Sequence, residues 1–290
     1  MDQNKGLALV LSTAIISGFS IFINKFGVAG INPDIFTLLK NAVVAVLFLS
    51  AFLLFRNFPR ISKKQWGQLT LVGLLGGSIP FILFFRGLQL TSAASASFIH
   101  KTMFIWVSIL SVILLKNRLD KKSIALAIIL LLGNFLVLNL SSFSFGKGEL
   151  LILAATLLWS IETIISKSAL KTIDSKTVAF GRMFFGSAFI LAFLMATGNF
   201  TLALSVSQLS WIGITSIFLF FYVFTWYSGL QAVDPVVATS ILLLGSPVTT
   251  LLDFLYTHQV NPVQMLGSLI IVSGVILLTQ THRTSMANPR

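Results

Sequence analysis

Long apolar segments recur along the whole chain, and the short stretches between them hold most of its charged and turn-forming residues. A helix of roughly 20 apolar residues covers the hydrocarbon core of a bilayer, so segments of this length indicate membrane-spanning helices. The pattern predicts ten spans, at residues 6–26, 35–55, 66–90, 93–115, 123–140, 148–170, 177–197, 209–231, 235–257 and 262–280. The tail at 284–290 is expected to be disordered.

The composition supports this interpretation. Of the 290 residues, 56% are hydrophobic and 10% are charged, whereas a soluble domain usually carries about 25% charged residues. Too few polar residues remain to cover the surface of a soluble protein, so the predicted fold class is an all-α integral membrane protein. The chain has no cysteine, which excludes disulfides, thiol nucleophiles and thiolate metal sites.

Basic residues are concentrated on one side of the predicted membrane, the side on which the chain begins. They are Lys5, Arg56, Arg60, Lys63, Lys64, Lys116, Arg118, Lys121, Lys122, Lys167, Lys171, Lys176, Arg283 and Arg290. Cytoplasmic loops carry an excess of Lys and Arg, so both termini are predicted to be cytoplasmic, in a plasma (inner) membrane. The net charge of +12 then reflects topology and contact with anionic membrane lipids, and nucleic-acid binding is not expected.

The two halves of the chain resemble each other at an offset of about 142 residues, as in 229 − 87 = 142. Gly87-Leu88-Gln89 matches Gly229-Leu230-Gln231, and Lys40 matches Arg182. Each half holds five predicted helices, an odd number, so the second half enters the membrane from the opposite side. We therefore predict two inverted five-helix repeats, at 1–143 and 144–283. This plan is typical of secondary transporters, whose substrate site lies near the midplane between the repeats.

Several short segments carry a resemblance to a known family. In the sixth span, Leu158-Trp159-Ser160 is followed by Ile165-Ser166-Lys167, and Lys40 and Arg182 each lie early in the second span of their half. Small residues recur at 93–98 and at 236–241, which contains Ser240, and Gly245-Ser246-Pro247 follows. In these features the chain resembles an EamA-type member of the drug/metabolite transporter superfamily. The resemblance implies two tandem EamA-like repeats and a transporter, but neither the substrate nor the coupling ion.

Ionisable residues inside the spans are the first candidates for function, because burying a charge in a membrane is costly. His100 and Lys101 lie about eight residues into the fourth span, which at about 1.5 Å per residue places them near the midplane. They are interpreted either as a cationic patch for a substrate carboxylate or as a structural pair bonded to backbone carbonyls. His100 is also a candidate proton relay.

Glu162 and Arg182 lie at a similar depth in adjacent spans, and we expect them to form a buried ion pair. That pair would be either a proton-sensitive gate or a static contact between the two helices. Trp159 is interpreted as lining an apolar pocket or as a packed side chain. The predicted substrate-binding residues are Lys40, His100, Lys101, Trp159, Glu162, Arg182 and Ser240.

No P-loop, dinucleotide fingerprint or HExxH motif occurs, and the three histidines are widely separated, so no cofactor and no metal are expected. The sequence favours a secondary transporter that moves amino acids or other small metabolites outward by alternating access. A carboxylate-bearing substrate is expected, with protons as a candidate second partner. The alternatives are a membrane-embedded lipid-modifying enzyme, which needs a more clustered set of polar groups, and a structural membrane subunit, which has no need of Lys101 at the midplane.

Overall fold

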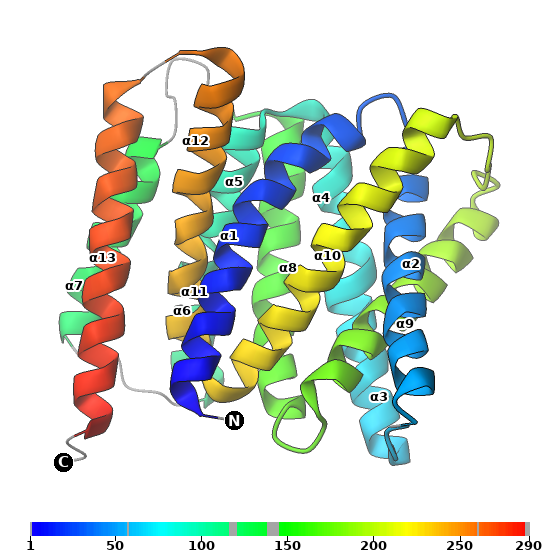
Figure 1. Ribbon diagram of the computed structural model, residues 1–290, viewed down its shortest axis with the longest axis horizontal. Coiled ribbons are helices and arrows are strands. Elements are labelled where there is room, and N and C mark those ends of the chain that lie inside the picture. Colours follow the sequence, from blue (N-terminus) through cyan, green and yellow to red (C-terminus); the bar gives the residue numbers. More distant parts are fainter. Residues whose placement is uncertain (1, 57, 116–120, 138–144, 260, 288–290) are drawn as a thin grey trace.

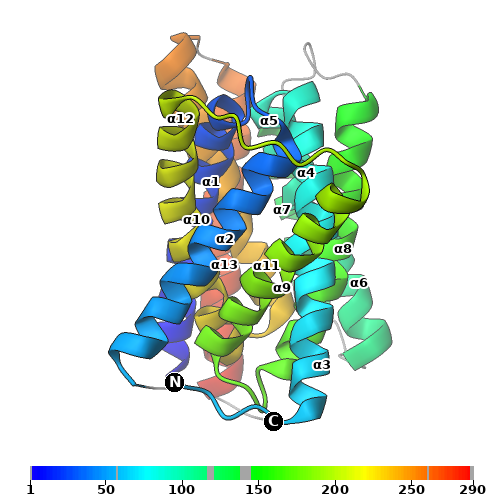
Figure 2. The same cartoon turned by 90° about the vertical axis from the view of Figure 1, so that its right-hand side faces the viewer.

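The computed structural model describes residues 2–56, 58–115, 121–137, 145–259 and 261–287, and within these ranges the secondary structure is entirely helical (Figures 1 and 2). Nine helices in this part are long and apolar enough to cross a membrane, and Ile124–Val137 is a shorter apolar helix. Together they correspond to the ten predicted spans, so the all-α membrane fold is confirmed. The predicted end of the fifth span, 138–140, lies outside the described residues.

The helices of the first half follow the order of the predicted spans, but the third and fourth spans are divided. They are α1 (Gln3–Gly27), α2 (Pro33–Leu54), α3 (Lys63–Val72), the π-helix η1 (Gly73–Ser78), α4 (Ile79–Leu90), α5 (Ala93–Lys101), α6 (Met103–Leu115) and α7 (Lys121–Val137). The second half repeats this order with α8 (Lys147–Ala169), α9 (Ser175–Ala196), α10 (Val206–Ala232), α11 (Pro235–Ile241), the 3₁₀-helix η2 (Leu242–Leu244), α12 (Gly245–Thr257) and α13 (Pro262–Ala287). The last helix continues into the tail that was expected to be disordered.

Each half supplies helices that pack against the other half. Helix α1 lies beside α10, α4 beside α8, and α2 beside α9, while α7 and α13 pair at one edge (Figures 1 and 2). Helix α1 begins and helix α13 ends at the same end of the bundle (Figures 1 and 2). An even number of membrane crossings requires this placement.

The inverted repeat is visible in its hydrogen bonds. Lys25 Nζ on α1 donates to the carbonyl oxygens of Leu88, at 2.9 Å, and of Thr91, at 2.5 Å. At the same offset of 142, Lys167 Nζ on α8 donates to the carbonyl oxygens of Leu230 and Val233, both at 2.8 Å. Basic side chains near the ends of spans often extend towards the membrane surface. Each of these two lysines satisfies instead the free carbonyls at the C-terminus of a neighbouring helix.

Two helix N-termini repeat the same symmetry between the halves. Ser62 and Gln65 form a capping box at the start of α3, as Ser205 and Gln208 do at the start of α10. The capping glutamines then bond across the halves. Gln65 Nε2 donates to the Thr172 carbonyl at 3.0 Å, at the end of the bundle where α1 begins. Gln208 Nε2 donates to the Gly30 carbonyl at 2.9 Å, at the opposite end.

The fourth and ninth spans are both interrupted at matching positions, near the middle of the bundle. Helix α5 ends at Lys101 and α6 starts at Met103, with the Thr102 hydroxyl donating to the Ile99 carbonyl at 2.7 Å. A side chain that bonds nearby backbone in this way competes with the regular helix. In the second half η2 separates α11 from α12, and Pro247 follows it without an N–H for the helical ladder.

Candidate substrate cavity

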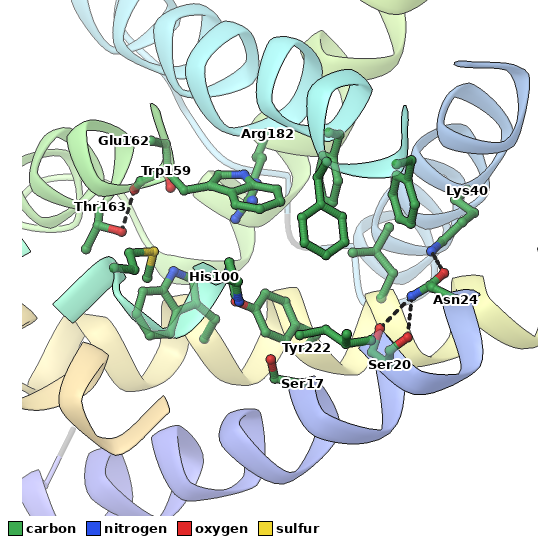
Figure 3. A pocket seen from close by; sticks show the side chains of 17 residues that line it. Ser17, Ser20, Asn24, Lys40, His100, Trp159, Glu162, Thr163, Arg182 and Tyr222 are labelled. Atoms are coloured by element: carbon green, nitrogen blue, oxygen red, sulfur yellow. Dashed lines mark hydrogen bonds between the residues drawn. The ribbon is translucent and has the colours of Figure 1, made fainter. Parts of the chain in front are cut away.

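A cavity lies between the two halves at the level of these interruptions (Figure 3). Its walls come from α1, α2, α4, α5 and the first residue of α6 in the first half, and from α8, α9 and α10 in the second. About 60 Å³ within it is open to the centres of water molecules, which is room for several waters. A metabolite therefore needs the walls to move apart before it can bind.

Five of the seven predicted site residues line this cavity: Lys40, His100, Trp159, Glu162 and Arg182. All five are buried, with at most 7% of their surface exposed. They come from four helices, α2 and α5 of the first half and α8 and α9 of the second. That these residues bind a substrate stays a prediction.

The first polar cluster, which we call the Lys40 group, consists of Lys40, Asn24 and Ser20. Lys40 Nζ donates to Asn24 Oδ1 at 2.5 Å, and Asn24 Nδ2 donates to Ser20 Oγ at 2.9 Å (Figure 3). The ammonium also lies 4.8 Å and 4.6 Å from the ring centres of Phe36 and Phe85. Among the described residues no carboxylate comes within 4.0 Å of this ammonium, so its charge has only neutral partners.

The second cluster, the Arg182 group, consists of Arg182, Tyr227, Glu162 and Ser166. The Tyr227 hydroxyl donates to Glu162 Oε1 at 2.6 Å and accepts from Arg182 Nη1 at 3.3 Å. The Ser166 hydroxyl donates to the same carboxylate oxygen. The expected direct ion pair between Glu162 and Arg182 is therefore wrong, because Tyr227 lies between them.

Arg182 keeps unused hydrogen-bonding capacity. Its Nε is buried without a partner among the described residues. The guanidinium stacks instead on aromatic rings, 5.3 Å from the ring centre of Phe81 and 5.7 Å from that of Tyr227. Tyr227 matches Phe85 at the offset of 142, so both basic residues face an aromatic ring at equivalent positions.

Aromatic rings occupy the space between the two groups. The Trp159 ring centre lies 5.2 Å from that of His100 and 5.3 Å from that of Phe84, in edge-on and tilted arrangements. Trp159 Nε1 donates to the Gly76 carbonyl at 2.9 Å. That carbonyl belongs to η1, and π-helical turns of this kind are frequent at functional sites. The Trp159 ring is thereby held in one orientation against the cavity.

Lys101 and Ser240, the other two predicted site residues, lie outside the cavity lining. Lys101 is 1% exposed, and its Nζ donates to Ser17 Oγ at 2.6 Å and lies 3.5 Å from His100 Nδ1. Ser17 itself lines the cavity, so Lys101 stands behind it. Ser240 is 2% exposed, and its hydroxyl donates to the Val236 carbonyl at 2.8 Å.

Tyr227, Asn24 and Ser20 belong to the two polar groups but were not among the predicted site residues. A single tyrosine in an apolar span carries no charge and belongs to no motif. Its match with Phe85 in the first half, beside Lys40, is the one available signal. Over the described part of the chain no group of three His, Cys, Asp or Glu side chains is placed to hold a metal ion.

Comparison with known proteins agrees with this architecture. The model of the EamA-like transporter family matches residues 4–139 and 146–280. An uncharacterized transporter of Archaeoglobus fulgidus is 23% identical over 96% of this chain and 98% of its own length. The uncharacterized transporter YetK of Bacillus subtilis is 24% identical over 98% of this chain and 89% of its own length.

Two further comparisons cover almost the whole chain. The riboflavin transporter ImpX of Fusobacterium nucleatum is 23% identical over 97% of this chain and all of its own length. One crystal structure superposes with a TM-score of 0.78 over 98% of this chain and 99% of the other, at 18% identity, which shows a shared fold. Since the family model matches both halves, this multi-pass membrane protein belongs to the EamA-like transporter family.

Proposed function

We propose that this protein is a secondary transporter that moves a small metabolite outward across the plasma membrane by alternating access through the cavity between its halves. The support is the family, together with relatives that are named transporters. The chain has no nucleotide-binding motif, so transport would run on a gradient or downhill.

The observation that carries the proposal is the position of the cavity between two inverted halves, beside matching helix interruptions after Lys101 and at η2. In inverted-repeat transporters the substrate site lies at this place, and interrupted helices border it. Inverted halves also supply two related conformations, in which the contacts made by one half are exchanged for those of the other. The cavity would open to one side of the membrane in each.

We further propose that both termini face the cytoplasm. The support is the excess of Lys and Arg on the side where the chain begins. With that orientation, Gln65 and Thr172 lie at the cytoplasmic face, and Gln208 lies at the outer face.

The substrate is proposed to be an amino acid or another small metabolite with a carboxylate. The support is the pair of buried basic side chains on the cavity wall, Lys40 and Arg182. Among the described lining residues only Glu162 carries a carboxylate, so the positive charges outnumber the negative ones. Because one relative is named a riboflavin transporter, riboflavin belongs among the compounds to be tested.

The test is flux into proteoliposomes made with the purified protein. A panel of radiolabelled amino acids, small carboxylates and riboflavin is offered to vesicles that are preloaded with the same unlabelled compound. We expect protein-dependent exchange of at least one compound, loss of that exchange in Arg182→Met, and normal exchange in Arg60→Met, whose side chain is exposed outside the spans. A monodisperse wild-type protein that exchanges none of the panel would contradict the proposal.

A further inference from the structure

The two basic residues of the cavity are related by the repeat but differ in how their charge is balanced. Arg182 reaches the carboxylate of Glu162 through the Tyr227 hydroxyl. Lys40 has only the Asn24 amide oxygen as a hydrogen-bond partner. Both side chains are at most 3% exposed, so water contributes little to either.

The difference comes directly from the sequence. At the offset of 142, Glu162 corresponds to Ser20, because 162 − 142 = 20, and Ser166 corresponds to Asn24. The first half therefore has a basic residue, Lys40, at the position of Arg182, but it has no counterpart of Glu162, the acid that balances Arg182. Buried charges are normally paired, and an unpaired one is costly. The missing anion at Lys40 is what a ligand can supply.

The walls between the groups indicate the rest of the ligand. Phe84, Trp159 and Trp226 line the cavity together with Tyr222, and all lie within the spans. Aromatic side chains favour stacked or edge-on contacts with other flat rings. The Trp159 ring is held by its bond to the Gly76 carbonyl, so the orientation of this ring is fixed before a ligand binds.

Resting on the proposed transport function, we propose that Lys40 is the anion-binding residue of the cavity and that the substrate is an organic anion with a flat, apolar body. The anionic group of the substrate forms an ion pair with the ammonium of Lys40, beside Asn24. The flat body lies against the rings of Trp159 and Phe84. Arg182 is the weaker candidate, because Glu162 already offsets its charge. Lys101 is screened from the cavity by Ser17.

The test is equilibrium binding to the purified full-length protein in detergent, measured by titration calorimetry. The probes are benzoate, nicotinate and indole-3-acetate, each compared with its neutral amide, and also hexanoate and tryptamine. We expect at least one flat acid to bind tenfold or more tightly than its amide, and more tightly than hexanoate or tryptamine. Acids that bind no better than their amides, or tighter binding of tryptamine, would overturn the proposal.

Variants locate the effect on Lys40. Lys40→Met should lower affinity for the preferred acid at least tenfold and remove the difference between acid and amide. Lys63→Met, at an exposed position at the start of α3, should change neither. If Lys40→Met does not fold, Asn24→Asp serves in its place, because it gives the ammonium a permanent carboxylate and should abolish the acid preference. Retention of that preference in the folded variant overturns the assignment.

The result is separable from the proposed function. Exchange of other panel compounds in proteoliposomes without any preference for acids would leave transport intact and remove the anion site. Absence of all exchange would remove the transport proposal itself.

Discussion

Replacing Tyr227 with Phe removes one hydroxyl, the group that joins the two charged residues of the Arg182 group. The side chain is fully buried. Its hydroxyl donates to Glu162 Oε1 at 2.6 Å and accepts from Arg182 Nη1 at 3.3 Å. The ring itself stays, and Phe85 at the equivalent position of the first half shows that phenylalanine fits such a site.

The expected cost follows from the two lost bonds. A hydrogen bond to a charged group contributes about 1.5–3 kcal/mol in soluble proteins, while bonds between membrane helices average about 0.6 kcal/mol. The bond to Glu162 is short and carries most of the effect, whereas the bond to Arg182 is long. We expect Tyr227→Phe to lower the free energy of unfolding by about 1–3 kcal/mol, since the carboxylate keeps only Ser166 as a partner.

The assay is reversible unfolding in mixed micelles, followed by circular dichroism. Tyr256→Phe is the matched control, because Tyr256 is 64% exposed and its loss should change stability by less than about 0.5 kcal/mol. On a Glu162→Gln background the cost of Tyr227→Phe should shrink, as contacting residues are not additive. Equal, small effects of Tyr227→Phe and Tyr256→Phe would refute the bridging role of the hydroxyl.

Two further predictions concern packing and topology. A Cβ added at Gly77 would lie 2.1 Å from the Arg182 carbonyl oxygen, so Gly77→Ala should destabilise the protein by about 1–3 kcal/mol or more through overpacking. Gly67 has nothing within 4 Å of an added Cβ, so Gly67→Ala should stabilise α3 by about 0.5–1 kcal/mol. Similar melting temperatures for the two variants would argue against the close crossing of η1 and α9. In intact cells Ser205→Cys should react with a membrane-impermeant thiol reagent and Ser62→Cys should not, and the reverse labelling would invert the proposed orientation.

The fold was largely predictable from the sequence, because a membrane leaves few choices. Apolar segments of the required length locate the spans, and most described helices begin and end within a few residues of the predicted limits, as for α2 at Pro33–Leu54 against 35–55, although α13 extends to Ala287. The repeat was predictable from polar residues such as Lys40 and Arg182, which stand out in apolar helices. Their offset reappears in the hydrogen bonds of Lys25 and Lys167.

The arrangement inside the cavity was less predictable. A helix that is apolar on every side gives no hydrophobic face from which its rotation can be inferred. The neighbouring residues His100 and Lys101 therefore looked equivalent, although one lines the cavity and the other bonds to Ser17 behind it. The interruption of the fourth span at Thr102 was also missed, because it has no proline and arises from a hydroxyl bond to backbone.

The central claim is that one cavity is reached in turn from both sides of the membrane, and a single cysteine tests it most directly. Ser20, a partly exposed cavity residue on α1, is replaced by Cys in this cysteine-free chain, and inside-out and right-side-out vesicles are treated with an impermeant thiol reagent. The account predicts that Ser20→Cys is labelled from both sides of the membrane. Cross-linking cysteines placed at Gln65 and Thr172 should abolish labelling from the cytoplasmic side, because it holds that side closed. Labelling from one side only, or from both sides regardless of the cross-link, would contradict alternating access.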